Sequence, residues 1–165
     1  MANTAITISP TRVTPLSEQE VAATGYNARF RVLSTDILYG TGTSDTVTVT
    51  LGATPAKWYI DKAGVNISTA FTGSTVASII VGTTSSTAAL TSSTSILTAA
   101  FLNQAVGVPV LTNTTATAAV NLVATFTVGV GGPAALTAGQ LDIYLNLTNT
   151  ALLPESGVEC QGHMA

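Results

Sequence analysis

Serine and threonine are abundant, but a nucleophile needs a base, and the one histidine and the one cysteine lie near the far end of the chain. The one histidine, His163, stands three residues after the one cysteine, Cys160. This spacing is that of half a metal site, and two further ligands would be needed to complete it. A serine triad would require the terminal segment to fold back into a cleft. These residues predict no metal site, no cofactor and no enzyme.

Other candidate sites have simpler explanations. Asp36, Asp45 and Asp61 fall at the expected ends of strands, where calcium could be held by loop carboxylates and carbonyls, but no calcium-loop pattern accompanies them. Turn-forming aspartates are the favoured interpretation. The glycine-rich run 129–133 follows a predicted strand with no helix after it and no lysine, so it predicts a turn and not a phosphate-binding loop.

Charge is scarce and unevenly distributed. Only 8% of the residues are charged, against about 25% in ordinary soluble domains. The stretch from Ala63 to Leu141 has no Asp, Glu, Lys, Arg or His, and all the Lys and Arg residues precede it. No basic stripe exists, so nucleic-acid binding is not expected. No run of about 18 apolar residues occurs, and the start has neither a basic nor an apolar signal region, so we expect neither a membrane segment nor a secretory signal.

The hydrophobic pattern predicts an all-β fold. Apolar and polar residues alternate over several short runs, which is typical of half-buried strands. Turn residues separate these runs about every ten residues. We therefore expect an antiparallel β-sandwich, jelly-roll-like, with about seven or eight strands, one short helix and an extended N-terminal arm. The expected parts are the arm at 1–27, the sandwich body at 28–150 and a loose C-terminal tail at 151–165.

Local patterns give further predictions. Ser17 should cap a short helix within 16–23. The first body strand, with Ala28, Phe30 and Val32 inward, should continue through 36–39. Residues 72–74 should turn one strand into its hairpin partner, and Ile96 to Leu102 should form the helix of the body. We also expect strands at 46–51, 58–60, 74–81, 118–128 and 140–148, and a surface loop at 83–95.

Charged residues near the start are the candidate partner contacts. Arg29 and Arg31 point outward from the first body strand, where they contact a partner or, equally, are solvated charges that prevent stray strand pairing. Arg12, Glu18 and Glu20 on the arm are the other candidates. The arm itself is either a partly ordered terminus or an extended segment that lies on a neighbour.

Trp58 and Tyr59 admit two interpretations. They could stack on a sugar, but a core tryptophan beside an exposed tyrosine is favoured.

Two stretches carry a family resemblance. Residues 65–73, Val-Asn-Ile-Ser-Thr-Ala-Phe-Thr-Gly, are followed by Ser-Ile-Ile-Val-Gly at 78–82, and Leu136 to Tyr144 reads Leu-Thr-Ala-Gly-Gln-Leu-Asp-Ile-Tyr. Together they resemble the small virion proteins with which tailed bacteriophages decorate or cement their capsids. The resemblance spans about residues 30–148.

The resemblance implies a function and partners. A protein of this kind would bind the major capsid protein on the outer capsid surface, commonly as a homotrimer, with an arm reaching over the shell. It would be made in the bacterial cytoplasm and would need no disulfide. A phage fibre or receptor-binding β-module is the alternative. A bacterial surface or sugar-binding domain would be expected to carry a secretion signal.

Overall fold

A computed structural model describes residues 5–7, 13–37, 45–54, 58–86, 88, 90–110, 120–129 and 131–149. For residues 5–7, 13–15, 45, 53–54, 58–59, 61, 102–110, 120 and 149 it describes the backbone only.

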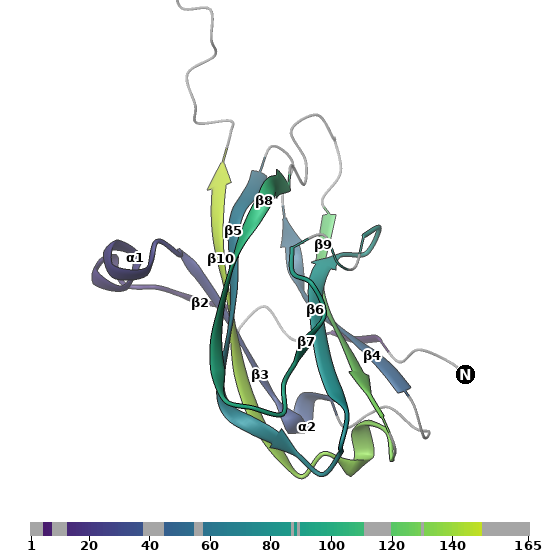
Figure 1. Ribbon diagram of the computed structural model, residues 1–165. Coiled ribbons are helices and arrows are strands. Elements are labelled where there is room, and N and C mark those ends of the chain that lie inside the picture. The colour runs from purple at the N-terminus through teal and green to yellow at the C-terminus, as the bar shows by residue number, and fades with distance from the viewer. Residues whose placement is uncertain are drawn as a thin grey trace, which may run out of the picture.

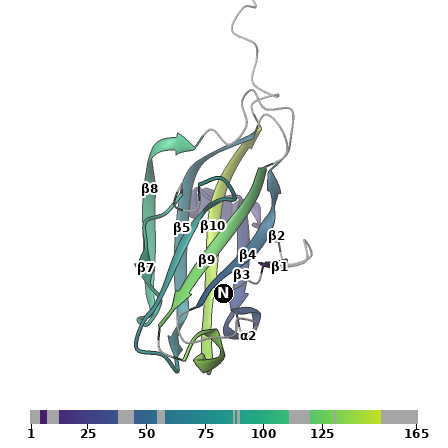
Figure 2. The same ribbon diagram turned by 90° about the vertical axis from the view of Figure 1, so that its right-hand side faces the viewer.

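Within these residues ten strands form two five-stranded sheets, which face each other as a sandwich (Figures 1 and 2). The predicted all-β sandwich is therefore confirmed. All strand pairs are antiparallel except β1 with β4. Sheet A has the order β1 (Ala5–Thr7), β4 (Asp45–Thr54), β9 (Val120–Val128), β6 (Ala77–Thr83) and β7 (Thr94–Ser95). Sheet B has the order β2 (Val13–Pro15), β3 (Ala28–Leu33), β10 (Ala138–Asn149), β5 (Trp58–Thr72) and β8 (Ala100–Val110).

The strand pairs are nested along the chain. The innermost pair is β6 with β7, followed outward by β5 with β8, β4 with β9 and β3 with β10. Strands β3, β4, β5 and β6 alternate between the two sheets. The predicted hairpin across residues 72–74 is therefore wrong: the turn is present, but it carries the chain from β5 in sheet B to β6 in sheet A.

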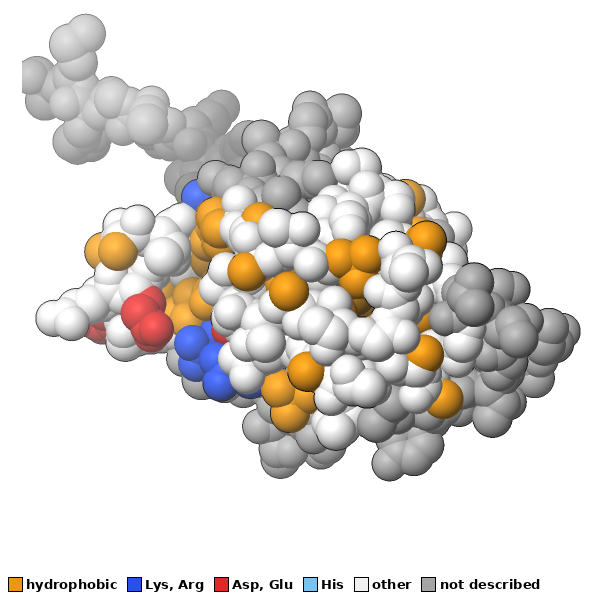
Figure 3. Space-filling model, turned by 60° about the horizontal axis from the view of Figure 1, so that its bottom comes forward, with side chains coloured by type: hydrophobic (Ala, Val, Ile, Leu, Met, Phe, Trp, Pro, Cys, Tyr) orange, Lys and Arg blue, Asp and Glu red, His pale blue; other side chains and the backbone are white. Residues whose placement is uncertain are grey.

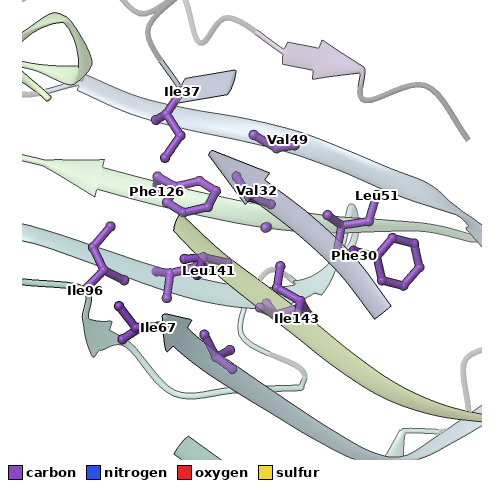
Figure 4. Close-up of a cluster of buried hydrophobic side chains, with 14 of the residues drawn as sticks. Phe30, Val32, Ile37, Val49, Leu51, Ile67, Ile96, Phe126, Leu141 and Ile143 are labelled. Carbon is purple, nitrogen blue, oxygen red and sulfur yellow. The ribbon is translucent and has the colours of Figure 1, made fainter. Parts of the chain in front are cut away.

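The core lies between the sheets and follows the predicted alternation. The inward residues of β3 and β4, and those of β9 from Leu122 to Val128, are buried as expected; those of β10 are buried except Leu147, which is partly buried against the core. Burying each large aliphatic or aromatic side chain contributes about 1.5–3 kcal/mol. Figure 4 shows such side chains from both sheets meeting in one cluster, including Phe30, Val49, Phe126, Leu141 and Ile143.

The N-terminal region adds to both sheets. β1 lies along β4 in sheet A, and β2 lies along β3 in sheet B. Between β2 and β3, helix α1 (Glu18–Thr24) has Ser17 as its N-cap, as predicted. The Ser17 side chain accepts from the Glu20 N–H, and the Glu20 carboxylate accepts from the Ser17 N–H, which completes a capping box. A further contact of the arm with a neighbour stays a prediction.

Three local predictions are wrong. The first body strand ends at Leu33, and a turn of helix, α2 (Ser34–Ile37), follows it. The Asp36 carboxylate accepts from the Leu33 N–H at 2.8 Å, which favours the turn over an extended chain. The short strand expected at 58–60 is part of the fifteen-residue β5.

The third error is the helix expected at Ile96 to Leu102. The chain there enters strand β8, and Ile96 is buried between the sheets. The Ile96 N–H bonds to Ala77 O and its carbonyl accepts from the Phe71 N–H, so its backbone groups are already satisfied outside a helix.

The loop expected at 83–95 lies only partly on the surface. Leu90 and Thr91 are buried, and both of their N–H groups bond to Val81 O on β6. β7 ends this segment.

The loop between β9 and β10 contains a short 3-10 helix, η2 (Pro133–Ala135). Gly139 follows it with φ 145°, and a Cβ there would lie 2.3 Å from the Phe71 ring. Only glycine therefore allows β10 to pass so close to β5 at this end of the sandwich.

Candidate partner-binding surface

The outer face of sheet B carries two rows of side chains in register. In the first row, Arg31 on β3 lies opposite Asp142 on β10, followed by Asn66 on β5 and Phe101 on β8. In the second row, Arg29 lies opposite Tyr144 and then Gly64. Side chains directly opposite one another in adjacent strands share a face and interact. The four longest strands of sheet B thus bring together residues that are far apart in the sequence.

An ion pair anchors the first row. The Arg31 guanidinium donates through Nε to Asp142 Oδ1 at 2.8 Å and through an Nη to Oδ2 at 3.1 Å. The Asp142 side chain is only 5% exposed, whereas that of Arg31 is 48% exposed. The hydrogen bonds to Asp142, and then its negative charge, raise the pKa of Arg31. This two-pronged geometry fixes the arginine in one orientation on the face.

Aromatic rings lie beside the ion pair. Tyr144 contacts Tyr26 with ring centroids 5.8 Å apart and Phe101 with centroids 6.3 Å apart. Lys62 Nζ lies 4.4 Å from the centre of the Tyr26 ring, a cation–π contact. Tyr26 is buried, and this burial raises the pKa of its phenol. Phe101 is 53% exposed and is one of two large hydrophobic side chains that stand out from the described surface.

Helix α1 projects from the same side of the sandwich (Figure 1). None of its residues is buried. Its last turn is fixed to the sheet because Lys62 Nζ donates to Thr24 O at 2.8 Å. The Asn27 side chain, just beyond the helix, donates to Leu147 O at 2.7 Å and accepts from the Leu147 N–H at 2.8 Å. The helix is therefore held in place by polar contacts at its base and leaves its sides free of the core.

In the acidic first turn of α1, Glu20 lies close enough to Arg29 to be affected by its charge. The Ser17 N–H and hydroxyl hydrogen-bond the Glu20 carboxylate and lower its pKa, and the charge of Arg29 adds a smaller effect in the same direction. Glu18 lies exposed in the same turn. Among the charged residues whose side chains the structure describes, all but Asp36 lie on α1 or on this face: Glu18, Glu20, Arg29, Arg31, Lys62 and Asp142. Figure 3 shows the red and blue side chains on the side where α1 projects.

The opposite outer face, on sheet A, has no charge among its described side chains. Thr48 on β4, Thr125 on β9 and Ile80 on β6 form one row, and Thr46, Thr127 and Ser78 form the next. Thr125 is buried, and its hydroxyl has no hydrogen-bond partner in the described part of the chain.

The predicted contact residues divide into three groups. Arg29, Arg31, Glu18 and Glu20 lie on α1 or on the outer face of sheet B. Two of these have structural partners: Arg31 is tied to Asp142, and Glu20 belongs to the capping box. Arg12 lies outside the described residues.

Sequence reasoning missed Tyr26, Lys62, Phe101, Asp142 and Tyr144 as members of this surface. Alternation placed Asp142 and Tyr144 on the outer face, but no local signal pairs them with β3. Trp58 and Tyr59 belong to β5, and their side chains are outside the description, so the two interpretations of them stay open.

Neither a protein-family model, nor a curated protein, nor a solved structure matches the chain. In the described residues no three or more His, Cys, Asp or Glu side chains lie together as a metal site would require. None of the described helices has the length and apolar character needed to cross a membrane.

Proposed function

We propose that the chain is a structural virion protein that binds the outer surface of a phage capsid and stabilises it. The resemblance of residues 65–73, 78–82 and 136–144 to capsid decoration proteins motivates the proposal. The β-sandwich body agrees with it. The partners would be the major capsid protein and further copies of this chain, as a homotrimer.

We further infer that the body is a jelly roll. The nested pairing of β3 to β10 is what a long hairpin gives when it folds over into two sheets of four strands. Jelly rolls of eight strands occur in viral capsid proteins and in lectins. This inference supports a virion role without singling it out.

The observation that carries the proposal is the concentration of charge around a projecting helix. An element that buries none of its residues contributes little to the core, yet α1 is capped at both ends and tied to the sheet. Ordering such a helix costs conformational entropy, and its packing against the rest of the protein does not compensate for this cost. Contacts of a partner with the helix and the adjacent face would compensate for it.

Within this surface Arg29 and Glu18 are the best candidates for direct partner contact. Arg31 is bonded to Asp142 and Glu20 to Ser17, so replacing either residue would also alter the stability of the fold. Replacing Arg29 or Glu18 changes charge without removing these bonds.

The neutral remainder of the surface suits contact between copies. Burying a threonine hydroxyl costs far less free energy than burying an unpaired charge. This supports the proposed homotrimer, and light scattering at micromolar concentration tests it: a monomer would contradict it.

Co-sedimentation with phage heads that lack the protein tests capsid binding. The wild-type chain should saturate the heads, and the double variant Glu18→Lys, Arg29→Glu should bind at least about tenfold more weakly, since lost charge pairs typically cost 1–2 kcal/mol or more at an interface. The charge-conserving double variant Glu18→Asp, Arg29→Lys is the matched control and should bind normally. Wild-type protein that fails to bind the heads would refute the proposal.

One observation favours a phage fibre or receptor-binding module instead. Phe101 and Tyr144 form an aromatic pair with Phe101 half exposed, as a recognition face would have. Immunogold labelling of the particle distinguishes the two: label over the whole head supports decoration, and label confined to a fibre tip supports the alternative.

A further inference from the structure

Three of the four sheet edges are closed by short segments of the chain. Strand β1, of three residues, covers β4; β2, also of three, covers part of β3; and the two-residue β7 covers part of β6. Next to β7, the N–H groups of Leu90 and Thr91 bond to Val81 O and extend the cover along β6. Very short edge strands are a common way to prevent unwanted strand pairing.

The fourth edge differs. Strand β8 has eleven residues and, among the described residues, pairs only with β5. Figure 2 shows it at the margin of the molecule. Its pairing with β5 is regular from Ala100 to Ala105 and then shifts before Val110. The regular part is long enough for an ordinary strand contact.

Strand β8 also lacks the usual protection of an open edge. Natural edges carry lysines or other charges, prolines or bulges that repel a second strand. β8 has no charged residue, and Pro109 lies beyond its regular part. Phe101 on this edge is 53% exposed.

We propose that β8 is a contact between copies, in which the Ala100–Ala105 edge pairs antiparallel with the same edge of a second copy. The two sheets B then become one continuous sheet. A second copy fits because the strand has no charge: identical edges place no like charges opposite one another. A contact made by the same surface on both partners is closed and two-fold. The exposed Phe101 side chains add apolar burial at its margin.

This contact is independent of capsid binding and can be tested with the chain alone. Hydrogen–deuterium exchange should be measured at a low and a high protein concentration. The amides of residues 100–105 that point away from β5 should exchange about fivefold more slowly when the total concentration is about ten times the dissociation constant, because about a fifth of the chains is then still monomeric. Amides of helix α1, which has no buried residue and lies next to β2 at the opposite edge of sheet B, exchange through local opening and should exchange equally at both concentrations.

A substitution at the edge sharpens the test. Ala100 is exposed and lies opposite the inward-facing Ile67, so Ala100→Lys adds an inward-pointing charge at the edge, which opposes strand addition. The variant should lose the concentration-dependent protection. Thr127→Lys, exposed on central strand β9, is the matched control and should keep it. Circular dichroism checks that both variants are folded.

Sedimentation separates this contact from the proposed trimer. If trimers form through another surface, β8 joins trimers, and Ala100→Lys lowers the mass to that of one trimer. If they do not form, the wild type is a dimer and the variant a monomer. Exchange at residues 100–105 that does not change with concentration, whatever the mass, would overturn the proposal.

Discussion

The outer face of sheet B carries arginine, lysine, aspartate and tyrosine, whereas the described outer face of sheet A consists of threonine, serine and apolar residues. Among the described side chains, each face has one buried polar side chain on its central strand. On sheet B, Asp142 receives two hydrogen bonds from Arg31. On sheet A, the Thr125 hydroxyl has no partner within the described residues.

This difference shows which of the two faces carries a specific polar interaction between strands. A buried carboxylate is tolerated only with a matched donor, so the Arg31–Asp142 pair fixes how β3 and β10 align. An unpaired hydroxyl costs much less, and the sheet A face tolerates it. Among the described side chains, charge is concentrated on one face of the sandwich and the other face is neutral.

The largest expected effect comes from breaking the ion pair. Arg31→Met leaves the buried Asp142 carboxylate without its two hydrogen bonds, and unfolding free energy should fall by about 2–3 kcal/mol. Urea denaturation measures this. Arg29→Met, two residues away on the same strand and on the same face, is the control and should change the free energy of unfolding by less than about 0.5 kcal/mol. Equal effects of the two changes would mean that the pair does not anchor the face.

The corresponding change on sheet A should act in the opposite direction. Thr125→Val replaces a buried hydroxyl that has no described partner with a methyl group of similar size, and should stabilise the protein by about 1 kcal/mol. Thermal unfolding measures the gain. Thr127→Val, on the same strand but exposed, should have little effect. A loss of stability in Thr125→Val would show that its hydroxyl does make a needed hydrogen bond.

The contacts that attach α1 to sheet B should contribute less to the free energy of unfolding. Lys62→Met keeps much of the aliphatic contact but removes the cation–π interaction with Tyr26 and the bond to Thr24 O, at a cost of about 0.5–1.5 kcal/mol. Amide exchange in residues 18–24 should accelerate more than exchange in β9. Uniform acceleration through both regions would mean that Lys62 supports the whole body and not the helix base.

The smallest effect is a pH dependence confined to α1. Because hydrogen bonds from Ser17 lower the pKa of Glu20 below its usual 4.5, the folded helix favours the charged carboxylate. The contribution is complete above the unfolded pKa and is lost as pH falls through the folded one. NMR should show the Ser17 and Glu20 amide signals shifting toward random-coil values in that acid range. Glu20→Gln should remove this titration, and its persistence would exclude the capping box as the cause.

The inward pattern of the sheets could be predicted because each half-buried strand alternates apolar and polar residues. Val47, Val49 and Leu51 on β4, like Leu122 and Phe126 on β9, are buried as that alternation requires. Ser17 as the N-cap of α1, followed by acidic residues in the first turn, is likewise a local signal. Such predictions depend on neighbours in sequence, and they were confirmed.

Predictions that depended on which strand pairs with which could not be made locally. A glycine turn at residues 72–74 indicates a reversal of the chain equally well within one sheet and between two. Leu97, Ala100 and Phe101 have helical spacing, but burial of Ile96 between the sheets overrides it. The pairing of Arg31 with Asp142 depends on a register set by the whole fold.

The nested order of strand pairs also has a consequence for how the protein is made. Arg31 and Asp142 are 111 residues apart in the sequence, while β6 and β7 are near neighbours. Contacts between distant residues form slowly because a long loop must be closed first. The innermost pairs can form early during synthesis, but β3 finds β10 only once nearly the whole chain has left the ribosome. The charged face is thus completed last, so a truncated chain would fail to present it.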